Sequence, residues 1–171
     1  MANGKYLRID DATGLIEEIE ALAVSTGATD ASKPIKTDSN GLIDLSLMPV
    51  GVGPDTEDLV ASEGLSAGEF VNVFDDAGVP KLRKADRTNN RPAHGFVIQN
   101  FASGQLAKMY KDSENNALTG LTIGATYFLG IAGAAVTTPP AAGSNHIRQV
   151  VGKAMKANNM DVEIGEAIAR K

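Results

Sequence analysis

The sequence contains no cysteine and no tryptophan, and aromatic residues make up only 5% of its 171 residues. Without cysteine the chain can form no disulfide, no thiolate metal site and no cysteine nucleophile. With so few aromatic side chains, the hydrophobic core must be assembled mainly from Val, Ile, Leu and Ala. The hydrophobic fraction of 43% is nevertheless sufficient for a folded core, so we do not expect global disorder.

Long apolar runs and an excess of basic residues are also missing. No run approaches the roughly 20 apolar residues that a membrane helix requires, and residues 1–5 begin no apolar signal stretch. We therefore expect a protein that is soluble where it is made and that has no membrane partner. The net charge is −5, whereas binding to a phosphate backbone requires clustered Lys and Arg. The basic residues within 81–91 have no aromatic residues among them, so we expect no nucleic-acid partner.

Histidine is scarce, and the usual catalytic motifs are absent. His94 and His146 are the only two histidines, and neither has a partner at the spacing of a metal site. We interpret both as structural or surface residues. There is no Gly-x-Ser-x-Gly motif, and the acidic pair Asp75-Asp76 lacks the spacing of a calcium loop. The sequence therefore predicts a protein that is not an enzyme, with no metal and no cofactor.

Short apolar segments separated by turn residues fill the second part of the sequence. Glycine is abundant, at 18 residues, which favours a chain with many turns. We predict strands within residues 59–61, 70–74, 81–85, 93–99, 105–110, 126–129, 147–155 and 160–164. This spacing predicts a mainly β fold, a small antiparallel β-barrel or sandwich. Helical segments between the strands are missing, which argues against a parallel α/β sheet.

Three local features of this part have specific structural meanings. Residues 75–78, Asp-Asp-Ala-Gly, predict a turn between two strands, because Asp favours turns and Gly78 permits a positive φ. Residues 112–116 also predict a turn. Gly95 lies inside a predicted strand, where glycine indicates a bulge or a close approach of another backbone segment.

The chain changes character near residue 55. Gly51, Gly53 and Pro54 mark a boundary. We expect residues 1–55 to form an extended N-terminal arm and linker, and residues 56–171 to form the β-barrel or sandwich domain.

Within the arm, residues 6–9 permit a short strand. Residues 14–23 favour a helix through the stripe formed by Leu15, Ile19 and Leu22, although the same residues also permit an extended segment. The arm therefore contains at most one short helix.

A dense apolar group lies near the end of the arm, after the turn signal Asn40-Gly41. Its members are Leu42, Ile43, Leu45, Leu47, Met48 and Pro49. These side chains either pack on their own domain or dock on another subunit. At roughly 25 cal/mol per Å² of buried apolar area, a few of them would contribute several kcal/mol to docking, partly offset by the entropy of ordering the arm. We treat these six residues as candidate partner-binding residues.

The order of several segments resembles that of known proteins. Residues 36–49 resemble a linker of bacteriophage fibre and capsid-surface proteins, through Lys36-Thr37-Asp38, Gly41, Ile43-Asp44 and Pro49. The segments that follow resemble the β-unit of capsid decoration (cement) and head-fibre proteins of tailed bacteriophages; they lie at residues 67–73, 79–86, 93–97, 121–129 and 150–154. The resemblance extends from residue 36 to the end of the sequence.

This resemblance implies a structural virion protein on the outer surface of the phage head, synthesised in the host cytoplasm. Its partner would be the major capsid protein, whose neighbouring subunits it would hold together. It would form homo-oligomers, with a trimer favoured over a dimer. The arm would contact the capsid or a neighbouring copy. The alternatives are a tail or fibre protein that binds the host surface, and an enzyme acting on surface polysaccharide, which would require two positioned carboxylates.

Overall fold

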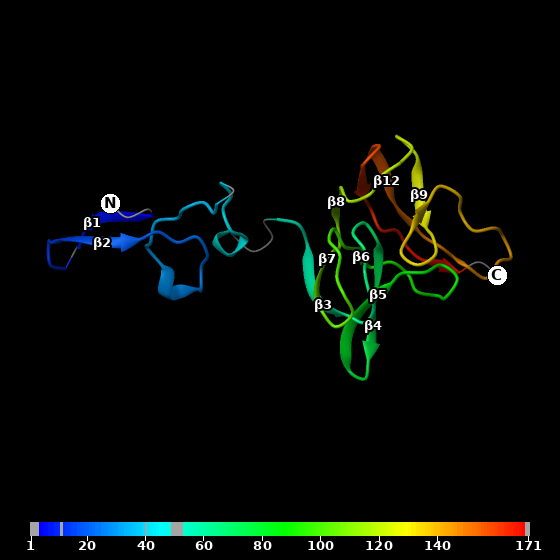
Figure 1. Cartoon of the computed structure of the whole chain (residues 1–171), viewed down its shortest axis with the longest axis horizontal. Coiled ribbons are helices and arrows are strands. Elements are labelled where there is room, and N and C mark those ends of the chain that lie inside the picture. The colour runs from blue at the N-terminus through cyan, green and yellow to red at the C-terminus, as the bar shows by residue number, and fades with distance from the viewer. Residues whose placement is uncertain (1–3, 11, 40, 49–52, 170–171) are drawn as a thin grey trace. The chain divides into compact units, whose positions relative to one another are not determined.

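The structure, a computed structural model, describes residues 4–10, 12–39, 41–48 and 53–169. The chain divides into two compact units, residues 1–53 and residues 54–171 (Figure 1). Helical structure in the described ranges is limited to two short 3-10 turns, η1 (Ala28–Asp30) and η2 (Leu45–Leu47). The predicted mainly β class is therefore confirmed. None of the helices in these ranges has the length and apolar character needed to cross a membrane.

The N-terminal unit begins with an antiparallel hairpin of β1 (Lys5–Ile9) and β2 (Ile16–Glu20), drawn as the blue arrows in Figure 1. The short strand predicted at residues 6–9 is confirmed, but the helix favoured at residues 14–23 is wrong. Each residue of β2 lies opposite a residue of β1, from Ile16 against Ile9 to Glu20 against Lys5. Cross-strand pairing thus prevails over the helical stripe, which was short enough to fit both structures.

Backbone hydrogen bonds, rather than a core, hold the rest of this unit together. The amide of Leu22 donates to the carbonyl oxygen of Pro34 at 2.8 Å, and the amide of Lys36 donates to the carbonyl oxygen of Leu22 at 2.9 Å. Ala21, whose amide donates to Gly4, is the one buried hydrophobic residue in the part of this unit that the structure describes. The unit therefore has little apolar burial of its own to stabilise it.

The second unit contains a small closed barrel. Its strands are β3 (Thr56–Ala61), β4 (Phe70–Asp76), β5 (Val79–Lys84), β6 (Gly95–Phe96) and β7 (Leu106–Tyr110), in the order β3-β5-β4-β6-β7. The barrel is mostly antiparallel, as expected, but β3 and β5 pair in parallel, with Val60 opposite Lys81. Alternation of apolar and polar residues shows which face of a strand is buried, but it does not show which strands lie next to it. The sequence therefore did not indicate this parallel pair.

The turn predicted at residues 75–78 joins β4 to β5. Asp76 lies opposite Val79, so Ala77 and Gly78 form a two-residue loop, with φ values of 55° and 87°. Positive φ at both positions is typical of tight hairpin turns. The Asp75 carboxylate accepts a hydrogen bond from the Gly78 amide at 2.8 Å. The predicted turn is thus confirmed, and the acidic pair ends β4 next to the loop, where the Asp75 carboxylate supports it.

The second sheet of this unit has the order β10-β9-β12-β13-β8. Its strands are β8 (Ser113–Asn115), β9 (Thr126–Leu129), β10 (Ala135–Val136), β12 (Val150–Lys156) and β13 (Asn159–Val162), and β11 (Ile147–Arg148) pairs separately with β14 (Ile168–Ala169). The turn expected at residues 112–116 is wrong, since these residues include β8. This short polar strand follows from its pairing with β13, which its own composition does not reveal.

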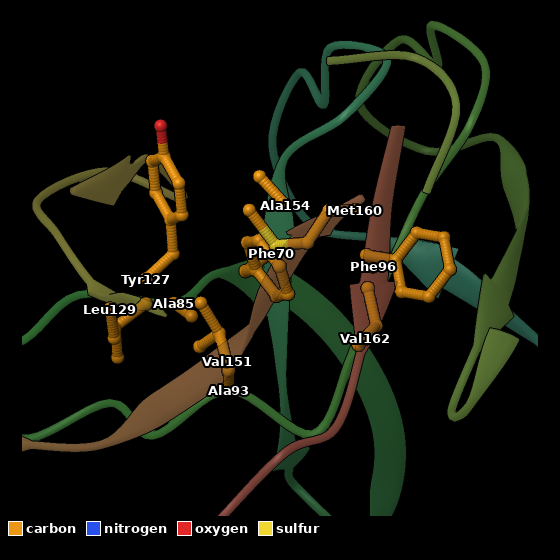
Figure 2. Packing of buried hydrophobic residues seen from close by; sticks show 10 residues of the cluster. All are labelled: Phe70, Ala85, Ala93, Phe96, Tyr127, Leu129, Val151, Ala154, Met160 and Val162. Atoms are coloured by element: carbon orange, nitrogen blue, oxygen red, sulfur yellow. The ribbon is translucent and has the colours of Figure 1, made fainter. Parts of the chain in front are cut away.

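Two buried clusters lie within this unit. The first joins barrel residues to the second sheet, and Figure 2 shows its members: Phe70, Ala85, Ala93, Phe96, Tyr127, Leu129, Val151, Ala154, Met160 and Val162. The second comprises Leu59, Ala61, Leu65, Val71, Leu82, Val97, Ala107 and Met109. Successive residues of a strand point to opposite faces, so Phe70 enters the first cluster and Val71 the second. One strand thereby connects both cores.

Gly95 of β6 lies close to residues 109 and 110 of β7. A Cβ atom at this position would lie 2.5 Å from the carbonyl oxygen of Tyr110 and 2.4 Å from Cγ of Met109. The close approach predicted from the sequence is confirmed. A side chain of any size would have to displace the backbone of β7.

Candidate interaction surface of the N-terminal unit

The N-terminal unit exposes most of its large hydrophobic side chains. Of the 16 exposed large hydrophobic residues that the structure describes, ten precede residue 54: Tyr6, Leu7, Ile9, Leu15, Ile16, Val24, Ile35, Leu42, Ile43 and Met48. The residues before position 54 make up less than a third of the chain. Soluble proteins rarely leave large hydrophobic side chains gathered at the surface unless a partner covers them.

One face of the hairpin carries three of these side chains. Leu7 and Ile9 alternate along β1, and Ile16 lies directly opposite Ile9 on β2. They are 61%, 65% and 71% exposed. An isolated two-stranded hairpin is marginally stable in water, because it has no layer against which to bury such a face. We call Leu7, Ile9 and Ile16 the hairpin face.

Charged side chains accompany the hairpin face. Lys5 pairs with Glu18 at 3.6 Å, Arg8 pairs with Glu17, and Lys36 approaches Glu20 at 3.9 Å. Because these pairs are exposed, each contributes little to stability, in the range of about 0–1 kcal/mol. By the register of the two strands, Glu18 lies beside Leu7 on the side of the hairpin face, whereas Arg8 and Glu17 lie on the opposite side.

The segment singled out from the sequence is also exposed where the structure describes it. Leu42 is 64% exposed, Ile43 45% and Met48 38%, whereas Leu47 is half-buried. Leu45 begins η2, but its side chain and the whole of Pro49 lie outside the described residues. The amide of Leu42 donates to the Asp38 carboxylate at 2.9 Å, which ties the start of the segment to Asp38.

The hairpin face was not among the candidate residues drawn from the sequence. The signal for it was the alternation of Lys5-Tyr6-Leu7-Arg8-Ile9, which predicts a strand with two distinct faces. The helical interpretation of residues 14–23 concealed the second strand, and with it the pairing of Ile9 with Ile16. We take the hairpin face and residues 42–48 as the two candidate interaction segments of this unit.

Both histidines lie in the second unit. His94 Nδ1 accepts a hydrogen bond from the Val73 amide at 3.0 Å, and partial burial lowers the pKa of this imidazole below its ordinary value. The backbone amide of His146 donates to Ser144 Oγ at 3.4 Å. Within the described ranges, no group of three or more His, Asp or Glu residues is arranged to hold a metal ion.

Comparison with known proteins finds a likeness among solved structures. No protein-family model matches the sequence, and no curated protein matches it. Among solved structures, the chain is similar to head fiber gp8.5 N base in bacteriophage phi29, with a TM-score of 0.46 and 14% sequence identity. The similarity covers 68% of this chain and 94% of that chain.

Proposed function

We propose that this chain is a structural protein of a tailed-phage virion that attaches to the outer surface of the head. The observation that carries the proposal is the exposed apolar surface of the N-terminal unit, which buries one described hydrophobic residue and exposes ten large ones. Such a unit is expected to be stabilised by a partner that covers it. The resemblance of residues 36–171 to decoration and head-fibre proteins supports the major capsid protein as that partner.

The energetics of attachment follow from the same surface. Leu7, Ile9 and Ile16 are each more than half exposed, and burying such side chains contributes roughly 1.5–3 kcal/mol for each one fully covered. Ordering the interface offsets part of this gain. A single copy can therefore bind weakly, while a homo-oligomer binds much more strongly, because its second and third contacts are intramolecular. A trimer, which we favour over a dimer, would match the three-fold positions of an icosahedral shell.

The two parts of the chain then have different roles. Residues 1–55 form the arm and linker that contact the major capsid protein or a neighbouring copy, through the hairpin face and the segment from Leu42 to Pro49. Residues 56–171 form the β-domain that faces outward. By contacting more than one capsid subunit, the protein stabilises their boundary as a non-enzymatic component of the virion.

Co-sedimentation with phage heads that lack this protein tests the proposal. Replacing Leu7, Ile9 and Ile16 together by serine should weaken binding at least about tenfold, because apolar area equivalent to more than 1.4 kcal/mol is lost. Deleting residues 1–53 should remove binding altogether. Sedimentation of the chain with heads, detected by gel densitometry over a range of concentrations, measures both effects.

A matched control is available in the second unit. Leu106, Ile123 and Met155 are 63%, 68% and 55% exposed, close to the values of the hairpin face. Replacing these three by serine removes a similar apolar area and should leave co-sedimentation unchanged. Undiminished binding of the deletion variant, or equal loss in the control, would refute the proposal.

A further inference from the structure

A second candidate site lies in the β-domain and contains none of the residues proposed for attachment to phage heads. Arg87, in the loop between β5 and β6, lines an open hollow of about 480 Å³. The other lining residues come from the segment before β9, from β9 and from β10 with the residues after it: Gly120, Thr122, Tyr127, Ala135, Val136, Thr137 and Thr138. This volume lies within the range of small-molecule sites.

Backbone hydrogen bonds fix the position of Arg87. Its amide donates to the carbonyl oxygen of Gly130 at 3.0 Å, and its carbonyl oxygen accepts from the amide of Ile147 at 2.9 Å. These contacts come from two other segments of the same unit. The arginine is therefore held on both sides, so its side chain extends from a preorganised part of the loop.

The neighbouring carboxylate is engaged elsewhere. One oxygen of Asp86 accepts hydrogen bonds from the amide and the hydroxyl of Thr88, at 2.8 and 2.6 Å, and the other accepts from the Ala132 amide at 3.1 Å. Burial raises the pKa of Asp86, but these hydrogen bonds outweigh it and hold the pKa below its ordinary value. Asp86 is thus an ionised residue that shapes the loop, with its oxygens committed to Thr88 and Ala132.

The Arg87 guanidinium has few partners of its own. Nη1 donates to the carbonyl oxygen of Thr138 at 3.3 Å, whereas Nε is enclosed without any hydrogen-bond partner. Within residues 53–169, no carboxylate forms a salt bridge with this side chain. A guanidinium has five N–H donors, and a buried donor without a partner costs about 1–3 kcal/mol. An unpaired buried donor in a native structure calls for an explanation, such as a bound water or ion, and the two terminal nitrogens of the same guanidinium are the atoms that a ligand in the hollow can reach.

Tyr127 supplies a second donor to the hollow. Its ring belongs to the first buried cluster, and Figure 2 shows its hydroxyl oxygen pointing away from the other labelled core residues. That oxygen accepts a hydrogen bond from the Thr122 amide at 2.9 Å. The hydroxyl retains its own proton, which is available to donate to a group in the hollow.

We propose that this hollow binds an acidic monosaccharide, with the sugar carboxylate on Arg87. Arginine pairs with carboxylates through two parallel hydrogen bonds, which are stronger than neutral ones and fix orientation. The tyrosine hydroxyl and the threonines that line the hollow suit the hydroxyl groups of a sugar ring. This site does not depend on the attachment of the N-terminal unit to phage heads.

Titration of the full-length, isotope-labelled protein with sodium glucuronate tests the site by nuclear magnetic resonance. The amide signals of Gly120, Thr122, Thr137 and Thr138 should shift, with a dissociation constant in the millimolar range, as expected for a single small contact. Arg87→Gln should weaken binding at least about tenfold, because it removes the charged donor. Arg87→Lys, which keeps the charge without the forked geometry, should also weaken binding, by several-fold.

Two controls make the test specific. Lys153→Gln removes the same charge from the exposed face of β12 and should bind glucuronate as the wild type does. Glucose, which lacks the carboxylate, should cause no shifts at the same concentrations. Equal binding of glucose, equal binding of inorganic phosphate, or no shifts with glucuronate would each overturn the assignment. Co-sedimentation with heads should be unaffected by Arg87→Gln, which separates this inference from the proposed function.

Discussion

Replacing Gly95 by alanine is expected to destabilise the β-domain by about 3 kcal/mol, at the upper end of the usual cost of overpacking. Gly95 is buried, and the added methyl group would lie 2.5 Å from the Tyr110 carbonyl oxygen and 2.4 Å from Met109 Cγ. The Met109 side chain can adjust, but Tyr110 contributes backbone, which moves only if β6 and β7 separate. Since these strands close the barrel, the strain affects both cores.

Gly64 provides the matched control for this substitution. A Cβ atom at Gly64 would have no neighbour within 4 Å. Gly64→Ala should therefore change the free energy of unfolding by less than about 1 kcal/mol. Urea denaturation followed by circular dichroism measures both variants. Equal stability of Gly95→Ala and Gly64→Ala would show that the close approach of β6 and β7 is not as described.

Replacing Phe70 by alanine is expected to cost about 4 kcal/mol of stability, the typical loss for a buried phenylalanine. Phe70 is completely buried, and its ring centroid lies 6.2 Å from that of Phe96. It belongs to the cluster that joins the barrel to the second sheet, so a cavity here weakens the contact between them. Unfolding should also become less cooperative, because the barrel and the second sheet then stabilise each other less.

Phe74 lies four residues further along the same strand and serves as the control. It is only half-buried, and the Arg83 guanidinium lies 4.3 Å from its ring centroid. Phe74→Ala should cost about 1–2 kcal/mol, because the lost contact is partly solvated. Thermal unfolding by calorimetry distinguishes the two variants. A loss for Phe70→Ala no larger than that for Phe74→Ala would contradict the assignment of Phe70 to the central core.

Turn chemistry and glycine made much of the second unit predictable. The Asp75-Asp76-Ala77-Gly78 turn and the close approach at Gly95 both depend on local properties that a sequence reveals directly. Pairing depends on the rest of the chain and was less predictable. The polar strand β8 exists because β13 pairs with it, and the parallel contact of β3 with β5 follows from closure of the barrel.

The candidate interaction residues were likewise predictable only in part from the sequence. Residues 42–48 were recognisable as a dense apolar group, and Leu42, Ile43 and Met48 are indeed exposed. The hairpin face was not recognisable from the sequence, because its members are brought together only by the pairing of β1 with β2. An exposed strand face also looks like a buried one in sequence. A strand face can be identified as exposed only once the structure shows that no other layer covers that face.

Amide hydrogen exchange of the full-length protein, free and bound to phage heads, tests most directly whether the N-terminal unit is the attachment surface. Binding should slow exchange in residues 5–20 and leave residues 126–162 unchanged, because the hairpin gains a covering partner and the second sheet does not. Saturating occupancy of the heads with no added protection in residues 5–20 would contradict this role. So would protection confined to residues 126–162.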